Sequence, residues 1–283
     1  MIVCRASLEM HAECRRLQRD GVRLGLVPTM GALHAGHLSL VSAALAECDA
    51  VAASIFVNPL QFAPGEDFDA YPREFEEDCA KLESAGVKLL FAPLASEIVP
   101  PDTATFVEVA GIGDRLDGAS RPGHFRGVAT IVAKLFHVAG PDRAYFGQKD
   151  AAQVAVLRRM VRDLNFPVHL VVCPIFREED GLAMSSRNRY LSATERKHAL
   201  VLPSALNAAQ ELVKRGERSA EALRAAIRAT FAADALVRLD YAEVVDADTL
   251  EPVVEISQGT LVAAAAWVGK TRLIDNFLVG PMD

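Results

Sequence analysis

Residues 24–41 read Leu-Gly-Leu-Val-Pro-Thr-Met-Gly-Ala-Leu-His-Ala-Gly-His-Leu-Ser-Leu-Val, and this stretch decides the fold. The apolar run before Pro28 is typical of a buried strand, the proline is expected to end it, and a helical pattern begins at about His37. Gly36 allows the backbone to approach a ligand closely, and the free N–H groups of a helix start favour an anion. The stretch therefore predicts a strand-turn-helix unit that binds phosphate.

The same turn carries two histidines, His34 and His37. Imidazole N–H groups can donate to charge that moves onto a leaving pyrophosphate. A histidine pair at this spacing is more often part of a metal site or a surface pair, so the pair alone is weak evidence. Zinc is disfavoured, because no acidic third ligand stands at helical spacing and Cys48 is predicted at the far end of the same helix.

Strands and helices alternate along the first part of the chain. The predicted strands are residues 23–27, 51–57, 88–91, 143–146 and 168–172, and the predicted helices start at about 37 or cover 73–84, 128–138 and 151–164. This alternation implies a mostly parallel sheet with helices on both faces, and such sheets bind ligands at the carboxyl ends of their strands. The residues that close four of these strands, and that are expected to converge on one crevice, are Pro28, Asn58, Gly147 and Pro174.

The pattern changes near Phe176, where a polar, turn-like segment begins. Beyond it we predict helices over 193–215 and 220–232 and strands around 241–245 and 260–268. The fold class is therefore α/β: a Rossmann-like, doubly wound parallel sheet in residues 1–176, followed by a smaller α+β domain in residues 177–283.

Composition narrows the class of protein. A chain of 283 residues with 51% hydrophobic residues can form two domains with real cores. Its net charge of −7 argues against a general nucleic-acid binder, and its longest apolar run is far too short to cross a membrane. Five scattered cysteines without a CxxC pair, and no apparent signal peptide, predict reduced thiols and a cytoplasmic protein.

Other segments carry polar groups that suit a nucleotide and its acceptor. Asn58 and Gln61 could direct amides at a hydroxyl-bearing substrate, although an Asn-Pro pair is at least as typical of a turn. The segment 121–127 is either an anion-friendly loop or a solvated one. The acidic run 74–78 is expected to be a solvated helix face rather than a metal site, so Mg²⁺ is expected to arrive with the nucleotide phosphates.

Two segments offer stronger phosphate chemistry. After a strand end, Gly147 permits close approach, Lys149 supplies a cation, and Asp150 suits a ribose or magnesium. Gln153 lies one helical turn further and should face the same crevice. Residues 184–187, Met-Ser-Ser-Arg, add hydroxyls and a guanidinium for the same phosphates.

Taken together, these segments resemble the pantoate–β-alanine ligase family of HxGH nucleotidylyltransferases over almost the whole chain. The matching segments are PTMGALHAGHLSL from Pro28, FVNPLQF from Phe56, YPRE from Tyr71, DGASRPGHFRGVATIVAKLF from Asp117, FGQKDAAQ from Phe146, DGLAMSSRNRYL from Asp180 and AAWVGKTRLIDN from Ala265. The chain departs from the family's usual pattern at Gln148, usually glutamate, and at Ala152, usually glutamine. These departures concern hydrogen bonding on the ATP side and helix packing.

The resemblance implies a two-step reaction. Pantoate attacks ATP, with Mg²⁺, to give pantoyl adenylate and pyrophosphate, and β-alanine then displaces AMP to give pantothenate. It also implies a homodimer and a C-terminal domain that closes over ATP. The implied substrate-binding residues are Gln61 and Gln153, and the implied catalytic residues are His37, His34, Lys149, Ser186 and Arg187. The implied ATP-binding residues are Met30, Gly31, Ala32, Leu33, His34, Ala35, Gly36, His37, Gly147, Gln148, Lys149, Asp150, Phe176, Met184, Ser185, Ser186 and Arg187.

Three alternatives remain at this point. An adenylyltransferase that stops after moving AMP would need a phosphate-binding acceptor pocket, whereas Gln61 and Gln153 are neutral. An aminoacyl-tRNA synthetase shares the HxGH motif, but this chain is short and acidic for that role. A nucleotide-binding sensor without catalysis would bind ATP and leave it intact.

Overall fold

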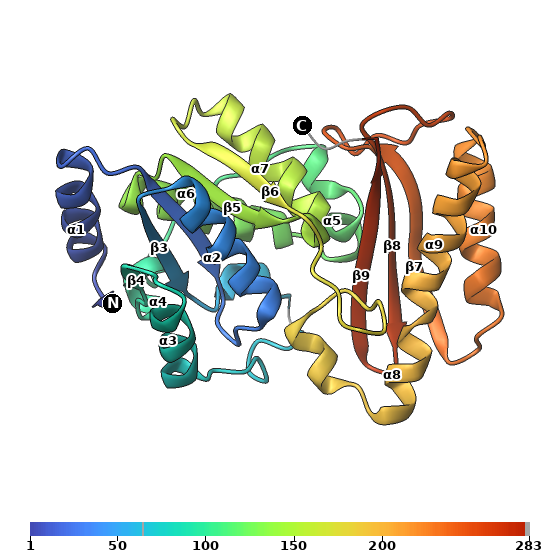
Figure 1. Cartoon of the computed structure of the whole chain (residues 1–283), viewed down its shortest axis with the longest axis horizontal. Coiled ribbons are helices and arrows are strands. Elements are labelled where there is room, and N and C mark those ends of the chain that lie inside the picture. The colour runs from blue at the N-terminus through green and yellow to red at the C-terminus, as the bar shows by residue number, and fades with distance from the viewer. Residues whose placement is uncertain (64, 281–283) are drawn as a thin grey trace. The chain divides into compact units, whose positions relative to one another are not determined.

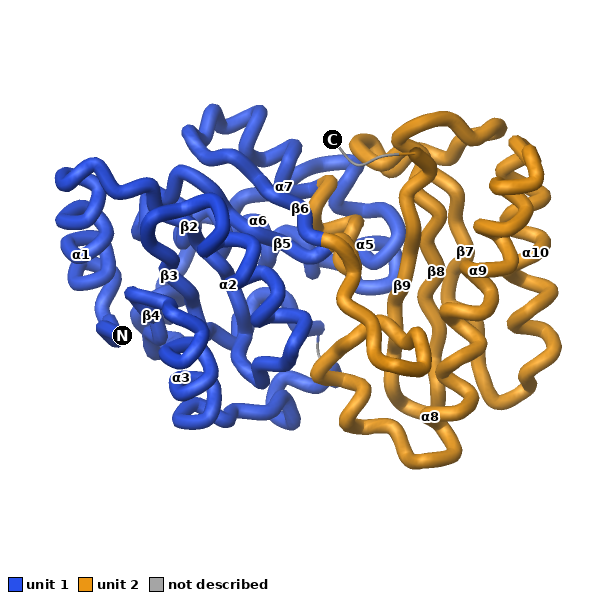
Figure 2. Tube along the Cα trace, viewed as in Figure 1, with its two compact units in different colours: residues 1–147, 156–173 blue, residues 148–155, 174–283 orange. Residues whose placement is uncertain are grey.

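The computed structural model describes residues 1–63 and 65–280, which belong to two compact units (Figure 2). Unit 1 comprises residues 1–147 and 156–173, and unit 2 comprises residues 148–155 and the chain from Pro174 onward. Each unit has its own sheet. The sheet of unit 1 is parallel and that of unit 2 is antiparallel, so the two units follow different folding patterns.

Unit 1 contains a six-stranded parallel sheet flanked by helices, which confirms the predicted Rossmann-like class (Figure 1). Its strands are β1 (Ile2–Cys4), β2 (Leu24–Thr29), β3 (Ala50–Ile55), β4 (Leu89–Phe91), β5 (Arg143–Gly147) and β6 (His169–Cys173), in the order β1-β4-β3-β2-β5-β6. Every neighbouring pair is parallel, so all carboxyl ends meet at one edge. The predicted edge for ligand binding therefore exists in this unit.

The helices of unit 1 cover this sheet. They are α1 (Ser7–Arg19), α2 (Ala35–Glu47), α3 (Phe75–Ser84), α4 (Ala95–Ile98), α5 (Asp117–Ser120), α6 (His124–Ala139) and most of α7 (Ala151–Asp163), with short 3-10 turns η1 (Pro59–Gln61) and η2 (Ile112–Asp114). One core cluster joins Val41 and Ala44 of α2 to Val51 and Ala53 of β3. Alternate residues of the strand face this helix because successive side chains of a strand point to opposite sides.

Strand β2 and helix α2 differ in extent from the prediction. The strand continues through Pro28 to Thr29 in register with β3, whereas it was expected to end at the proline. On its other side β2 pairs with β5 only at Gly25 and Leu26, so the N–H that proline lacks is not needed further along. Helix α2 begins at Ala35 rather than at His37, so Gly36 and His37 lie inside its first turn.

Unit 2 is built on a three-stranded antiparallel sheet with helices on one face (Figure 1). Its elements are β7 (Val237–Asp246), β8 (Thr260–Val268), β9 (Thr271–Val279), α8 (Ala193–Ala199), α9 (Val201–Lys214), α10 (Ala220–Ala232), η3 (Gln148–Asp150) and η4 (Ser186–Tyr190). Alternate residues of β8, such as Val262 and Ala264, pack in one core with Leu206 of α9 and Leu223 of α10. This face gives the smaller α+β architecture that the pattern predicted.

Two features of unit 2 were not predicted from the sequence. The single helix expected over 193–215 is two helices separated at Leu200, since Pro203 lacks an N–H and its ring would clash with the carbonyl four residues earlier. Strand β9 was not predicted, although it forms one edge of the sheet. By contrast, α10 and β8 have the predicted bounds.

The cysteines are free and mostly buried. Burial is the main reason why the pKa of Cys4 rises to about 11 and that of Cys14 to about 12. Both thiols are therefore protonated near neutral pH and pack as small apolar groups. Across residues 1–63 and 65–280, no helix has the length and apolar character needed to span a bilayer.

Helix α6 approaches the turn η1 so closely that only glycine fits at the contact. A Cβ built on Gly127 would lie 2.2 Å from the carbonyl oxygen of Leu60 and 2.7 Å from the backbone nitrogen of Gln61. Backbone atoms cannot rotate away as a flexible side chain can. The position of Gln61 therefore depends on the absence of a side chain at 127.

We predict that Gly127→Ala lowers the melting temperature, although Gly→Ala inside a helix ordinarily stabilises by about 1 kcal/mol. The added methyl group must push the backbone of residues 60–61 aside, so the Michaelis constant for whatever Gln61 binds should also rise. Gly113→Ala is the matched control, because its nearest neighbour would be 3.8 Å away. A Gly127→Ala protein as stable as the wild type would contradict the close approach.

Candidate active site

The turn between β2 and α2 is held by a carboxylate from α3. Asp78 is 1% exposed, and its two oxygens accept the N–H groups of Ala32 at 2.8 Å and Leu33 at 2.7 Å. Lys81, on the same helix, donates from Nζ to the carbonyl of Leu33 at 2.8 Å. Gly31 and Ala32 both have positive φ, 84° and 51°, and the strain is greater for alanine. The hydrogen bonds to Asp78 thus stabilise a backbone that would not adopt this shape alone.

The prediction of a solvated acidic face is wrong for Asp78. Glu76 and Glu77 are exposed, but Asp78 lies one turn before the buried Leu82 and so shares its inward face. Burial raises the pKa of Asp78, while the two backbone N–H groups and Lys81 act against this rise. The only signal in the sequence was this four-residue spacing from an apolar position, and the surrounding charges concealed it.

The two histidines of the HxGH motif lie together at the start of α2. His34 is the residue that precedes the helix, and its ring centroid is 4.0 Å from that of His37. The backbone N–H of His34 donates to Nδ1 of His37 at 3.3 Å. Because Nδ1 accepts this bond, a neutral His37 carries its proton on Nε2. His37 is therefore set to donate a hydrogen bond from Nε2.

The segment after β3 forms the turn η1, and Asn58 stabilises it. The side-chain oxygen of Asn58 accepts from the N–H of Leu60 at 3.0 Å, and its Nδ2 donates to Gly127 O at 3.1 Å and to Gln61 Oε1 at 2.9 Å. Asn58 is 2% exposed. This is turn chemistry, one of the two interpretations that the sequence left open. Gln61 Nε2 in turn lies 3.1 Å from the sulfur of Met30, which brings two of the expected binding residues together.

His124 supports the backbone of Gln61 from helix α6. Its Nδ1 lies 2.8 Å from the carbonyl oxygen of Gln61, which can only accept, so Nδ1 is the donor. Its Nε2 lies 3.0 Å from Nη1 of Arg121, which can only donate, so Nε2 is the acceptor. The surroundings therefore require neutral imidazole. Burial, followed by the charge of Arg121, lowers the pKa of His124 to about 4.

Arg121 is paired with a carboxylate. Its guanidinium donates to both oxygens of Glu66 at 2.7 Å and also to the carbonyl of Gln61 at 3.2 Å. The Arg121 side chain is 14% exposed. Burial opposes ionisation of Glu66, but the hydrogen bonds and charge of Arg121 lower its pKa overall. Neither the open anion site nor the solvated loop describes this arginine, which serves to fix the Gln61 segment.

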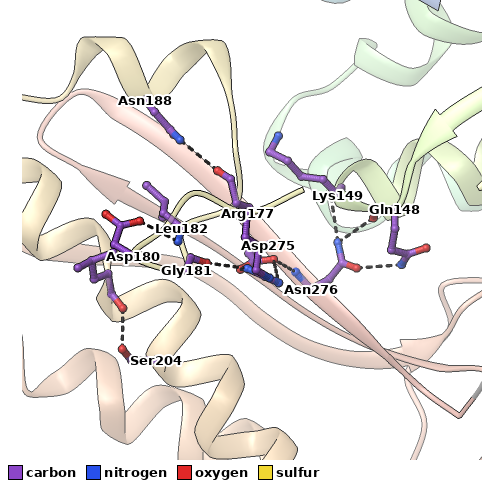
Figure 3. A network of polar contacts seen from close by, with 12 residues as sticks. Gln148, Lys149, Arg177, Asp180, Gly181, Leu182, Asn188, Ser204, Asp275 and Asn276 are labelled. Carbon is purple, nitrogen blue, oxygen red and sulfur yellow. Dashed lines mark hydrogen bonds and ion pairs between the residues drawn. The ribbon is translucent and has the colours of Figure 1, made fainter. Parts of the chain in front are cut away.

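Unit 2 holds the second group of expected residues, around the turn η3. Lys149 and Asp150 lie side by side, with Nζ and Oδ1 3.8 Å apart. Gln148 is 7% exposed, and its Nε2 donates to Asn276 Oδ1 at 2.9 Å (Figure 3). An ionised glutamate, the usual residue here in the resembling family, could not donate this bond. Gln153 follows in the first turns of α7 and is partly exposed.

The loop between β6 and α8 brings Phe176 close to the start of the serine-arginine segment. The N–H of Met184 donates to the carbonyl of Phe176 at 2.9 Å, and the Ser185 hydroxyl accepts the N–H of Arg187 at 3.3 Å. Ser185 thereby starts η4, in which Ser186 and Arg187 are partly exposed. Phe176 is 41% exposed. The loop thus carries an exposed ring together with hydroxyl and guanidinium groups, a set that suits a nucleotide.

The expected site residues thus fall into two groups, one in each unit. Unit 1 contains residues 30–37, Gln61 and Gly147, while unit 2 contains residues 148–150, Gln153, Phe176 and 184–187. Within the described parts of the chain, no group of three or more His, Cys, Asp or Glu residues could hold a metal ion. Sequence reasoning gave no supporting role to Asp78, Glu66 or Asn276. Asp78 was placed in a solvated acidic run, and Asn276 closes a segment that matches the family but to which no ligand chemistry was attached.

We predict that Asp78→Asn destabilises the protein by about 1–3 kcal/mol and lowers the rate of any reaction at the HxGH turn. Asparagine keeps one acceptor oxygen but turns an NH₂ group toward a backbone N–H, which leaves a buried donor unsatisfied. Urea denaturation and initial rates measure the two effects, and the exposed Glu76→Gln is the control. Equal stability and equal rate in Asp78→Asn would refute the anchoring role.

We also predict that stability falls as the pH drops from about 6.5 toward 4, because unfolded His124 takes up a proton near the ordinary value of 6.5 while the folded residue resists until about 4. Its contribution is complete above pH 6.5 and is lost through this window. His124→Asn keeps a donor for Gln61 and does not titrate, so its denaturation midpoint should vary less over the same range. Parallel pH profiles for both proteins would contradict the assignment.

The sequence profile described as Pantoate-beta-alanine ligase matches residues 2–278. Pantothenate synthetase of Koribacter versatilis is 57% identical over 279 residues, which cover 99% of this chain and 96% of the relative. That of Thermotoga neapolitana is 53% identical and covers 96% of this chain and 97% of the relative.

Solved structures agree with these relatives. Pantothenate synthetase from Thermus thermophilus has a TM-score of 0.94 and 48% identity, with 99% of this chain and 100% of that chain covered. Pantoate-beta-alanine ligase from Francisella tularensis, complexed with beta-gamma ATP and β-alanine, has a TM-score of 0.80 and 34% identity, with both chains covered completely. Because sequence and structure both match over nearly the full length, the chain belongs to the pantoate–β-alanine ligase family.

Proposed function

We propose that this chain joins pantoate to β-alanine at the expense of ATP with the residues of the HxGH turn at the centre of the chemistry. The pantoate carboxylate attacks the α-phosphorus, the bond to pyrophosphate breaks, and pantoyl adenylate forms. The amine of β-alanine then attacks the acyl carbon, an amide bond forms, and AMP leaves as the amine loses a proton. The observation that carries the proposal is the hydrogen bond from His34 N–H to His37 Nδ1, because it places the proton of a neutral His37 on Nε2, the nitrogen that would donate to charge developing on pyrophosphate.

The remaining phosphate contacts are assigned by residue chemistry. Residues 30–37 would bind ATP through the N–H groups at the start of α2, where the helix dipole favours an anion. Lys149, Ser186 and Arg187 would stabilise the phosphates electrostatically and position them, without a covalent enzyme intermediate. Gly147 allows close approach, since nothing lies within 4 Å of the position where its Cβ would stand.

The other assignments follow the family resemblance. Phe176 would contact the base, while Gln148 and residues 184–185 would contribute backbone and small polar groups. ATP and β-alanine as substrates are supported by the complex of the Francisella tularensis relative. Asp150 would face the ribose or the metal, and its partial exposure beside Lys149 suits either.

Pantoate is assigned to the two glutamines. Gln61 and Gln153 are neutral and offer both donors and acceptors, which suits a carboxylate that also carries hydroxyl groups. The support for Gln61 is its fixed backbone, which receives hydrogen bonds from His124 and Arg121, so its amide starts from a rigid position. A phosphate acceptor would instead call for cationic side chains, and Arg121 is already paired with Glu66.

Three further parts of the proposal rest on the resemblance. Mg²⁺ would be bound mainly by nucleotide phosphates, because it prefers oxygen ligands and is usually held through few protein carboxylates together with substrate phosphates. The chain would act as a homodimer, and it would act in the cytoplasm, where its free thiols would stay reduced. A domain boundary after residue 176, with closure of the C-terminal domain over ATP, also stays a prediction.

The test is pantoate-dependent exchange of labelled pyrophosphate into ATP, measured with Mg²⁺ and without β-alanine. We expect exchange with the wild type, and a loss of about 100- to 1,000-fold in His37→Asn, which keeps an acceptor near the position of Nδ1 but lacks the Nε2 donor. His37→Gln, whose amide reaches the position of Nε2, should retain more activity than His37→Asn.

His169→Asn is the control for this test, because His169 is exposed at the start of β6. Normal exchange in both His37 variants would remove His37 from the chemistry. Absence of exchange in a folded wild type that binds ATP would show that pantoyl adenylate does not form reversibly, and the proposed function would fail.

A further inference from the structure

Two adjacent residues of β9, Asp275 and Asn276, hold both of the phosphate-directed segments of unit 2 (Figure 3). They are 1% and 3% exposed, so their polar groups have left water and depend on protein partners. Neither residue belongs to the groups expected to contact ATP, pantoate or β-alanine. Their contacts show what they do for the segments around them.

The amide of Asn276 is fully used by the turn η3. Its Nδ2 donates to the carbonyl of Gln148 at 3.1 Å and to that of Lys149 at 2.9 Å. Its Oδ1 accepts from Gln148 Nε2 at 2.9 Å. Carbonyl oxygens only accept, so the nitrogen end of Asn276 must face them, and this orientation requires a donor from residue 148. One side chain thus fixes two successive peptide groups of the turn that carries Lys149.

Asp275 holds the other segment. It accepts two hydrogen bonds from Arg177, at 2.7 and 3.0 Å, in a bidentate ion pair. Arg177 also donates to the carbonyl of Gly181 at 3.0 Å, which ties the loop that leads to Met184. The same carboxylate accepts the backbone N–H of Asn276 at 2.8 Å. Through this bond the two anchors are fixed relative to each other.

We propose that Asn276 is a positioning residue, which holds the Gln148–Asp150 turn so that the Lys149 ammonium meets the nucleotide phosphates. The neighbouring Asp275, through its ion pair with Arg177, positions the 176–187 segment from the same strand. This inference rests on the proposed role of Lys149. Lysine is a flexible cation on a long stem, so its charge is useful only if the backbone that carries it is fixed. Neighbouring residues of a strand are separated by about 3.3 Å along it, so β9 acts as a common reference for both segments.

The test uses Asn276→Asp, a change of almost no volume that replaces two donors by an acceptor facing two carbonyls. We expect kcat/KM for ATP to fall by about 10- to 100-fold, the effect of a misplaced group. The KM for β-alanine should change little. Arg272→Gln, also on β9, is the matched control, since it breaks the part-buried ion pair with Asp240 without touching Gln148 or Lys149. It should reduce the melting temperature and leave the ATP kinetics unchanged.

A double-mutant cycle with Lys149→Ala separates positioning from general stability. If Asn276 acts through Lys149, adding Asn276→Asp to a protein that already lacks the lysine should lower kcat/KM for ATP by less than about 3-fold. Equal losses in both backgrounds would overturn the inference, as would ATP kinetics in Asn276→Asp that match the wild type. Should Asn276→Asp not fold, Gln148→Met removes the pairing amide at similar length, and the same cycle is run with it.

The cycle also separates the role of Lys149 itself from its positioning by Asn276. A Lys149→Ala protein with unchanged ATP kinetics would refute the role of Lys149 in the proposed function. A large loss in Lys149→Ala together with an unaffected Asn276→Asp would leave that role intact and refute only the positioning by Asn276.

Discussion

The pair of hydrogen bonds from Asp78 to the N–H groups of Ala32 and Leu33 is the constraint on which the HxGH turn depends. A parallel sheet delivers the chain to its carboxyl edge, but it does not shape the turn that follows. Here the turn contains a non-glycine residue at positive φ, which is held only because a buried carboxylate satisfies the backbone on both sides of it. Both histidines then lie at the start of α2, and the tautomer of a neutral His37 is defined.

The other two supports also fix backbone groups, but with neutral side chains. His124 and Asn276 are neutral groups that present a donor and an acceptor at fixed separation, and each meets a backbone carbonyl with the donor end. A neutral group is suitable because it is inexpensive to bury when its hydrogen bonds are complete. It also adds no negative charge to a site that is proposed to bind the phosphates of ATP. The charged residues can therefore bind the ligand or form ion pairs within the protein, as Arg121 does with Glu66.

The course of the main chain followed from the pattern of apolar residues. Strands β2 to β6 and helix α10 were predicted within a few residues, because their core-facing positions repeat with the period of a strand or a helix. Strand β9 and helix α1 were missed, since charged residues such as Arg272 and Asp275, or a run rich in arginine and glutamate, obscure that period. The break at Leu200 depends on a proline that a helical pattern tolerates in its first turn but not further along.

Local sequence was enough to identify the family and to nominate the ligand-directed residues, because phosphate chemistry requires glycine, histidine, lysine, serine and arginine in short contiguous motifs. The supporting residues were decided only by tertiary structure. Asp78, His124 and Asn276 stand 45, 63 and 127 residues from partners that they bind. A hydrogen bond between such distant positions leaves no periodic signal, and its meaning depends on burial, which arises only when the core has formed.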